Sequence, residues 1–129
     1  MSILDFFKPK PKRSQSYADA QWNRMWELWA NWEVPSPYFE LMNYSSEVNN
    51  GGHGQYFLNA EDNRDLDAEV RLLITVLPAV HAENLRTAYA FWCSDDSDDI
   101  CPDEFDLLFY TNEASINRML EQYARTIVL

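Results

Sequence analysis

A run of carboxylates late in the chain holds the residues most able to do chemistry. Seven of the 12 positions from 95 to 106 are acidic, namely Asp95, Asp96, Asp98, Asp99, Asp103, Glu104 and Asp106. Carboxylates spaced along a surface can stand in for phosphates in hydrogen bonds with Arg and Lys side chains. The pattern therefore predicts a surface that binds a cationic protein partner. A solvated loop without a ligand is the alternative interpretation.

Calcium is the first rival ligand for this run. An EF-hand loop needs oxygen ligands at positions 1, 3 and 5, glycine at position 6 and glutamate at position 12. Counted from Asp95, position 6 is Ile100 and position 12 is Asp106. The match is poor. Cys93 and Cys101 also lack the spacing of a zinc site, so we expect reduced thiols and predict no metal and no cofactor.

A second group of unusual residues lies between Glu47 and Asn59. All three glycines of the chain, Gly51, Gly52 and Gly54, fall there. Glycine tolerates positive φ and lets another group approach the backbone closely. The pattern predicts a helix that ends at Asn49-Asn50, an αL turn at Gly51-Gly52 and a new short helix that begins near His53.

This corner has a structural and a functional interpretation. In the first, Asn50, Gln55 and Asn59 satisfy the free amides of two helix ends while Tyr56 and Phe57 pack inward. In the second, Asn50, His53, Gln55 and Tyr56 line a ligand pocket. Neither His53, expected in a partly exposed loop, nor His81, expected to cap a helix, is recognisably paired with a serine or cysteine nucleophile. We therefore predict no catalytic residue and no enzyme.

The elements that must position these residues are all predicted to be helices. A tryptophan stripe at Trp22, Trp26 and Trp29, extended by Trp32, is expected to face the core. Asn63 or Asp65 is expected to cap a following helix. The fold class is thus an all-α, compact single-domain bundle of about six or seven helices, at residues 16–32, 38–49, 55–58, 66–77, 82–92, 102–110 and 113–126.

Charge divides the chain into a tail and a body. The net charge is −11, and because residues 1–13 carry +3, the other 116 residues carry −14 with six arginines and no lysine. Such a body is a poor ligand for nucleic acid and a good one for a basic protein. We assign residues 1–15 to a flexible, apolar-then-basic tail and residues 16–129 to the acidic helical domain.

The tail has three interpretations: a frayed end, a short anchor on anionic lipid, or a peptide that docks on a partner. Membrane contact is the least favoured for the protein as a whole, since no apolar run approaches the roughly 20 residues of a membrane span. We expect a cytoplasmic protein.

The corner also resembles the signature Asn-Gly-Gly-x-x-Gln-Tyr/Phe-Phe-x-Asn of a family of bacterial helical domains typified by a DNA-mimic protein. The matching positions are Asn50, Gly51, Gly52, Gln55, Tyr56, Phe57 and Asn59. Residues 105–110 and 120–124 resemble the family's Asp-x-x-x-Tyr helix and its closing tyrosine-bearing helix. The resemblance covers about residues 17–127.

The resemblance implies an all-helical monomer or homodimer of a family without known enzymatic activity. In the DNA-mimic protein that typifies the family, acidic side chains imitate the phosphates of duplex DNA and occupy the DNA-binding face of a transcription factor. We therefore expect a DNA mimic that acts in transcription regulation by binding the basic DNA-binding face of a regulatory protein. Two alternatives remain open: an immunity-type inhibitor of a cationic nuclease toxin, and a small-molecule binder or enzyme that uses the Asn-Gly-Gly corner.

Overall fold

The computed structural model describes residues 16–98 and 100–129, and every regular element in these two ranges is an α-helix. The helices are α1 (Tyr17–Ala30), α2 (Tyr38–Asn63), α3 (Leu66–Val76), α4 (Ala79–Trp92), α5 (Asp103–Thr111) and α6 (Glu113–Ala124). The all-α prediction is confirmed. The predicted N-terminal tail and Asp99 lie outside the described residues.

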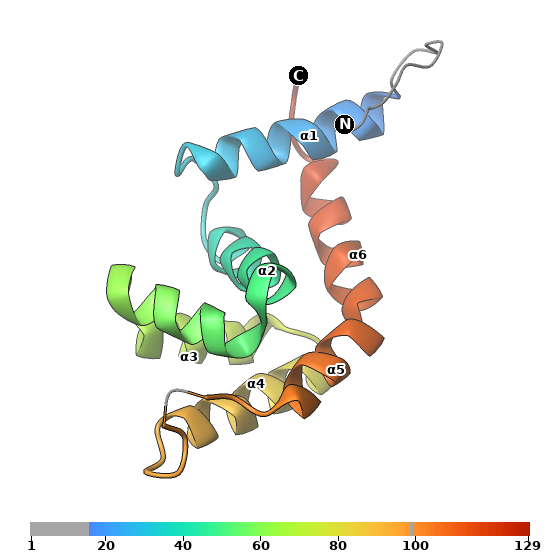
Figure 1. Cartoon of the computed structure of the whole chain (residues 1–129). Coiled ribbons are helices and arrows are strands. Elements are labelled where there is room, and N and C mark those ends of the chain that lie inside the picture. Colours follow the sequence, from blue (N-terminus) through green and yellow to red (C-terminus); the bar gives the residue numbers. More distant parts are fainter. Residues whose placement is uncertain (1–15, 99) are drawn as a thin grey trace.

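Helix α2 is the centre of the bundle. It contacts α3, α4, α5 and α6, whereas α1 contacts α6. Figure 1 shows α1 at one end of the molecule and α4 and α5 at the other. The core between them is strongly aromatic, with Tyr44, Tyr56, Phe57 and Phe109 fully buried. No helix of the described ranges has the length and hydropathy needed to cross a membrane.

Several helix ends follow from local chemistry. Ser16 Oγ accepts a hydrogen bond of 3.0 Å from the backbone N–H of Asp19, and Asp65 Oδ1 accepts one of 3.1 Å from Ala68. The predicted cap at Asp65 is confirmed. Helix α4 begins at Ala79, directly after Pro78, which is three residues earlier than predicted. His81 therefore lies inside the first turn of α4 and is buried, so its expected role as a cap is wrong.

The predicted break at the glycines is present as a kink inside α2. Gly51 has φ −160° and Gly52 has φ 83° and ψ 179°. The ψ angle places Gly52 in an extended region that essentially only glycine occupies, so the expected αL turn is wrong in detail. The second half of α2 continues through residues 59–63 and ends at Asn63, so the predicted end at Leu58 is wrong.

The tryptophan stripe of α1 is only partly a core face. Trp22, Trp26 and Trp29 are partly buried and pack against the core. Trp32 is 70% exposed, so its expected place in the core is wrong. It lies beyond the end of α1 with a φ of 61°, so it does not continue the helical spacing of the stripe.

Candidate functional site

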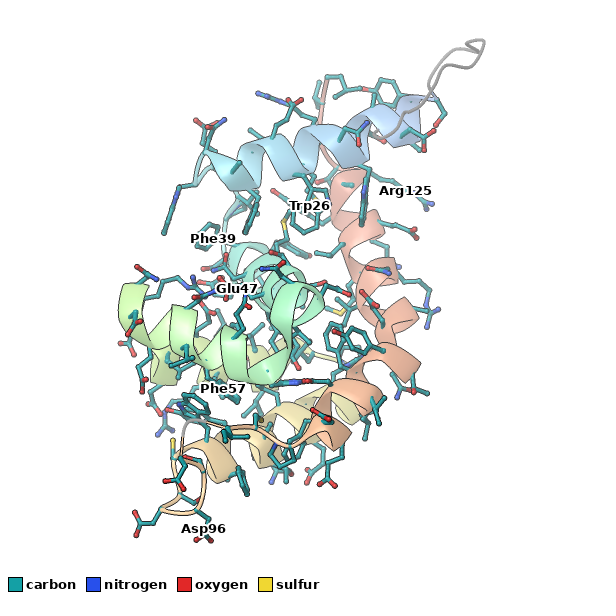
Figure 2. The ribbon with its side chains drawn as sticks, in the orientation of Figure 1. Trp26, Phe39, Glu47, Phe57, Asp96 and Arg125 are labelled. Atoms are coloured by element: carbon teal, nitrogen blue, oxygen red, sulfur yellow. The ribbon has the colours of Figure 1, made fainter. Side chains whose placement is uncertain are left out.

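Five of the seven predicted partner-binding carboxylates are exposed at one end of the molecule. Asp95, Asp96 and Asp98 lie in the loop after α4, and Asp103 and Glu104 lie in the first turn of α5. We call these five residues the acidic surface. In Figure 2 the labelled Asp96 lies at the far end of the molecule from α1. Asp99 falls outside the described residues.

Turn hydrogen bonds within the loop hold its carboxylates outward. The backbone N–H of Asp96 donates to Ser94 Oγ at 3.3 Å, and that of Ile100 donates to the buried Ser97 carbonyl at 2.8 Å. Among the described residues, no hydrogen bond or ion pair reaches a side-chain oxygen of the acidic surface. Within residues 16–98 and 100–129 no three His, Cys, Asp or Glu side chains are arranged to hold a metal ion.

The sequence around this surface provides no counterion. Between Arg86 and Arg118 the chain has eight acidic residues and neither lysine nor arginine. Arg86 itself forms an ion pair with Glu83. A stretch of this kind produces a one-sided negative field that attracts cationic groups from solution.

An apolar groove adjoins the acidic surface between α4 and α5. Its volume is about 380 Å³, and it is lined by Val80, Glu83, Asn84, Thr87, Glu104, Phe105 and Leu108. Val80 is 40% exposed and Leu108 is 37% exposed. The sequence does not reveal the groove, because Leu108 is as apolar as the neighbouring Phe105 and Phe109 and its exposure depends on how α5 packs. Only the two phenylalanines are buried.

Asp106 differs from the other carboxylates of the run. Its side chain is 23% exposed, and Oδ1 accepts a 2.9 Å hydrogen bond from the backbone N–H of His53 and a 2.6 Å bond from the ring Nδ1. A Cβ atom added to Gly52 would lie 2.4 Å from Asp106 Oδ2. Asp106 therefore binds within the glycine corner, where it accepts a hydrogen bond from a backbone amide of the kinked helix α2.

His53 continues this hydrogen-bonded chain inward. Its Nε2 lies 2.7 Å from the hydroxyl of Tyr44. Burial lowers the pKa of His53, although the bond with Asp106 opposes the shift, and burial raises the pKa of Tyr44. A neutral imidazole with its proton on Nδ1 fits both partners, because Tyr44 then donates to Nε2. The expectation that His53 lies in a partly exposed loop is wrong, since both residues are fully buried.

This Tyr44–His53–Asp106 chain has the order of a catalytic relay but not its accessibility. A relay needs its terminal hydroxyl within reach of a substrate. Tyr44 is 0% exposed and its raised pKa keeps the hydroxyl protonated. The geometry therefore supports the structural interpretation of the corner.

Tyr110, one turn beyond Asp106 on α5, holds the other half of the kink. Its hydroxyl donates to the Val48 carbonyl at 2.9 Å. The Asp-x-x-x-Tyr spacing thus places two side chains on one face of α5, where they bind α2 before and after its break. The nearby Cys101 is a free thiol whose pKa is raised to about 11 by burial and by the Asp106 carboxylate.

The signature residues divide into buried aromatics and surface amides. Tyr56 and Phe57 pack inward as expected. Gln55 Oε1 would lie 1.9 Å from a Cβ at Gly51, so the amide folds over that glycine. The side chains of Asn50, Gln55 and Asn59 make no hydrogen bond in the part of the chain that the structure describes. Asp106, in place of these amides, accepts the hydrogen bond from the backbone N–H of His53 at the break in α2.

A second buried polar network, which sequence reasoning did not find, surrounds Glu69. The hydroxyl of Tyr56 donates to Glu69 Oε2 at 2.6 Å, and the Arg64 guanidinium donates to Glu69 Oε1 at 3.0 Å and to Glu47 at 2.9 Å. Burial alone would lower the pKa of Arg64, but these two carboxylates raise it. Asn43 completes the network between Glu69 and the indole N–H of Trp29.

Comparison with known proteins agrees with these features. A family model described as DMP19-like protein matches residues 37–127. No curated protein and no solved structure matches the chain. The matched range runs from the start of α2 to the end of α6, so it includes both the kink and the helix that holds it. It leaves out α1, which the resemblance had included. The chain belongs to the DMP19-like protein family, a family of DNA-mimic type.

Proposed function

We propose that this protein is a non-enzymatic DNA mimic that binds the basic DNA-binding face of a regulatory protein through its acidic surface. The observation that carries the proposal is the set of five exposed carboxylates that have no ion-pair partner among the described residues. Asp99, of the same sequence run, is expected to contribute. Family membership supports the same class of function.

The physical basis is charge-assisted hydrogen bonding. A DNA-binding face presents Arg and Lys side chains at the spacing of phosphates, and carboxylates can accept the same hydrogen bonds. Within residues 16–98 and 100–129 no cation forms an ion pair with the acidic surface, so no such pair between described residues must break before a partner binds. Both cysteines are free thiols, which supports placing the protein in a reducing compartment such as the cytoplasm.

Affinity capture with DNA as competitor tests the proposal. Immobilised protein is incubated with native lysate at about 0.1 M salt, and retained proteins are challenged with duplex DNA and then with higher salt. We expect the retained partner to be released by either treatment. A partner that neither DNA nor salt releases would contradict mimicry, and a retained cationic nuclease would favour an immunity-type inhibitor.

Two charge-matched variants locate the binding surface. One replaces Asp95, Asp96, Asp98 and Glu104 by their amides. The control makes the same change at four exposed carboxylates of α1, α2 and α6, namely Asp19, Glu61, Asp62 and Glu121. Because both variants change the net charge equally, loss of the partner from the first alone supports the acidic surface. Equal retention by both would overturn it.

A further inference from the structure

An aromatic pocket lies beside the end of α1, away from the acidic surface. Its volume is about 300 Å³, and its walls include Trp29, Trp32, Phe39, Asn43, Glu47 and Arg64. In Figure 2 the labelled Phe39 and Glu47 lie near one end of α1, whereas Asp96 lies at the far end of the molecule. Three aromatic side chains and an ion pair therefore meet in one small concave site.

Trp32 is the most unusual wall of this pocket. The Glu33 N–H donates to the Leu28 carbonyl at 2.8 Å and the Trp32 N–H donates to the Trp29 carbonyl at 3.0 Å, which is the pattern of a helix that ends in a Schellman motif. Trp32 occupies the left-handed position of that motif, with φ 61°, where glycine is the usual residue. The helix end alone does not require an indole there.

The Trp32 ring is also left open to solvent. It rests on Phe39 with ring centroids 4.9 Å apart, yet 70% of the residue remains exposed. An indole held at a pocket mouth by a strained backbone and one stacking partner offers a free aromatic face. Exposed tryptophans of this kind are typical of binding hot spots.

The charges around the pocket have a negative excess. Arg64 is bonded to both Glu47 and Glu69, so its single positive charge meets two negative ones. A neighbouring depression shares Phe39 and Arg64 and adds Glu40. Glu40 Oε1 is buried without a hydrogen-bond partner among the described residues, while Ser36 donates to Oε2 at 2.7 Å. The two depressions together are therefore bordered by the carboxylates of Glu40, Glu47 and Glu69 and by one guanidinium, which is ion-paired with Glu47 and Glu69.

We propose that the aromatic pocket binds an organic cation, the guanidinium or alkylammonium group of an arginine-like or lysine-like ligand. Aromatic faces attract such cations through the ring quadrupole, and the excess of carboxylates favours positive over neutral ligands. The same chemistry has two sources, a side chain of a protein partner and a free amino acid. The site does not rest on the proposed DNA mimicry, because it shares no residue with the acidic surface.

A spectroscopic titration tests this site directly. The probes are N-acetyl-arginine amide and its uncharged isostere N-acetyl-citrulline amide, and the readout is the indole N–H signals in ¹H–¹⁵N spectra. We expect saturable shifts of Trp29 and Trp32 with the arginine probe, at least about tenfold weaker binding of citrulline, and an unmoved signal from the distant Trp92. Equal binding of both probes, or no shift at millimolar probe, would overturn the proposal.

Variants and a second pair of probes separate the remaining outcomes. Trp32→Gly removes the indole from a position that glycine occupies without strain, so the chain should stay folded and lose the Trp29 shift. Tyr17→Ala, at another exposed aromatic of α1, should keep the Trp29 shift.

A second pair of probes identifies the source of the cation. Stronger binding of a blocked peptide with a central arginine indicates a protein side chain, whereas stronger binding of free arginine indicates a metabolite. Retained binding by Trp32→Gly would also overturn the proposal.

The same titration of the acidic-surface amide variant distinguishes this site from the proposed function. The four substitutions lie outside the pocket walls, so the arginine probe should bind that variant as it binds the unchanged protein. If the affinity capture retains no DNA-binding protein, the arginine probe should still bind this variant and the unchanged protein equally.

Discussion

Asp106 and His53 are joined twice: Asp106 Oδ1 lies 2.9 Å from the His53 backbone nitrogen and 2.6 Å from its ring Nδ1. One carboxylate thereby satisfies the first amide after the kink and fixes the imidazole between itself and Tyr44. The kink of α2 is held by a residue 53 positions away in the sequence. Stability of the corner should therefore depend on three things: the glycine, the carboxylate and the neutral histidine.

Gly52→Ala should destabilise the protein by about 2–4 kcal/mol. The φ of 83° with ψ of 179° is closed to alanine, and the new Cβ would lie 2.4 Å from Asp106 Oδ2. Urea denaturation measures the change. Gly54→Ala is the matched control, because its nearest neighbour, Cys101 Cβ, is 3.7 Å from the added carbon. Alanine at this helical position should be neutral or stabilise by up to about 1 kcal/mol. Equal losses would refute the argument.

Asp106→Asn should cost about 1–3 kcal/mol, because an amide oxygen replaces a charged acceptor of two hydrogen bonds. Tyr110→Phe removes only the neutral bond to the Val48 carbonyl and should cost about 1 kcal/mol. Denaturant unfolding of both variants and of the double variant measures whether they are coupled. Since both side chains hold the same kink, the two effects should not add. Strict additivity would show that α5 does not hold the two halves as one unit.

Stability should fall as the pH decreases below about 6.5. Burial lowers the pKa values of His53 and His81 in the folded state. The unfolded chain, with histidine pKa values near 6.5, then binds protons that the folded chain does not. Stability is fully present above that pH and is lost below it, by at most about 1.4 kcal/mol per pH unit for each histidine. Ring-proton NMR titration checks the cause, and titration of both histidines at or above pH 6.5 would contradict it.

The helices could be predicted from local signals, whereas the contacts between them could not. The apolar spacing of α3 and α6, the cap at Asp65 and the start after Pro102 all depend on residues close in sequence. Three neighbouring glycines indicate an exposed loop at His53, and only the distant Asp106, which satisfies the break in α2, makes burial of His53 possible. Proximity in the sequence groups Asp106 with the exposed carboxylates, although its neighbour Phe105 belongs to the buried face of α5.

Tyr56→Phe should destabilise the protein by about 1.5–3 kcal/mol. The hydroxyl donates at 2.6 Å to the carboxylate of Glu69, and both side chains are buried, so its removal leaves one charged acceptor short of a donor. Thermal and urea unfolding measure the loss. Tyr123→Phe serves as the control, since Tyr123 stacks on Tyr38 and its hydroxyl has no hydrogen bond among the described residues. A loss no larger than that of the control would show that Arg64 and Asn43 satisfy Glu69 without the tyrosine hydroxyl.

Leu108→Ala should weaken binding of the captured partner about tenfold without changing the salt dependence of its affinity. Leu108 is 37% exposed beside Glu104 in the α4–α5 groove, so it can contribute apolar contact where the acidic surface contributes charge. Glu104→Gln should instead reduce the salt dependence, because it removes one charge from the encounter. Calorimetric titrations at two salt concentrations separate the effects, with Leu58→Ala, at a leucine of α2 that is 41% exposed, as control. A purely electrostatic interface would leave Leu108→Ala indistinguishable from that control.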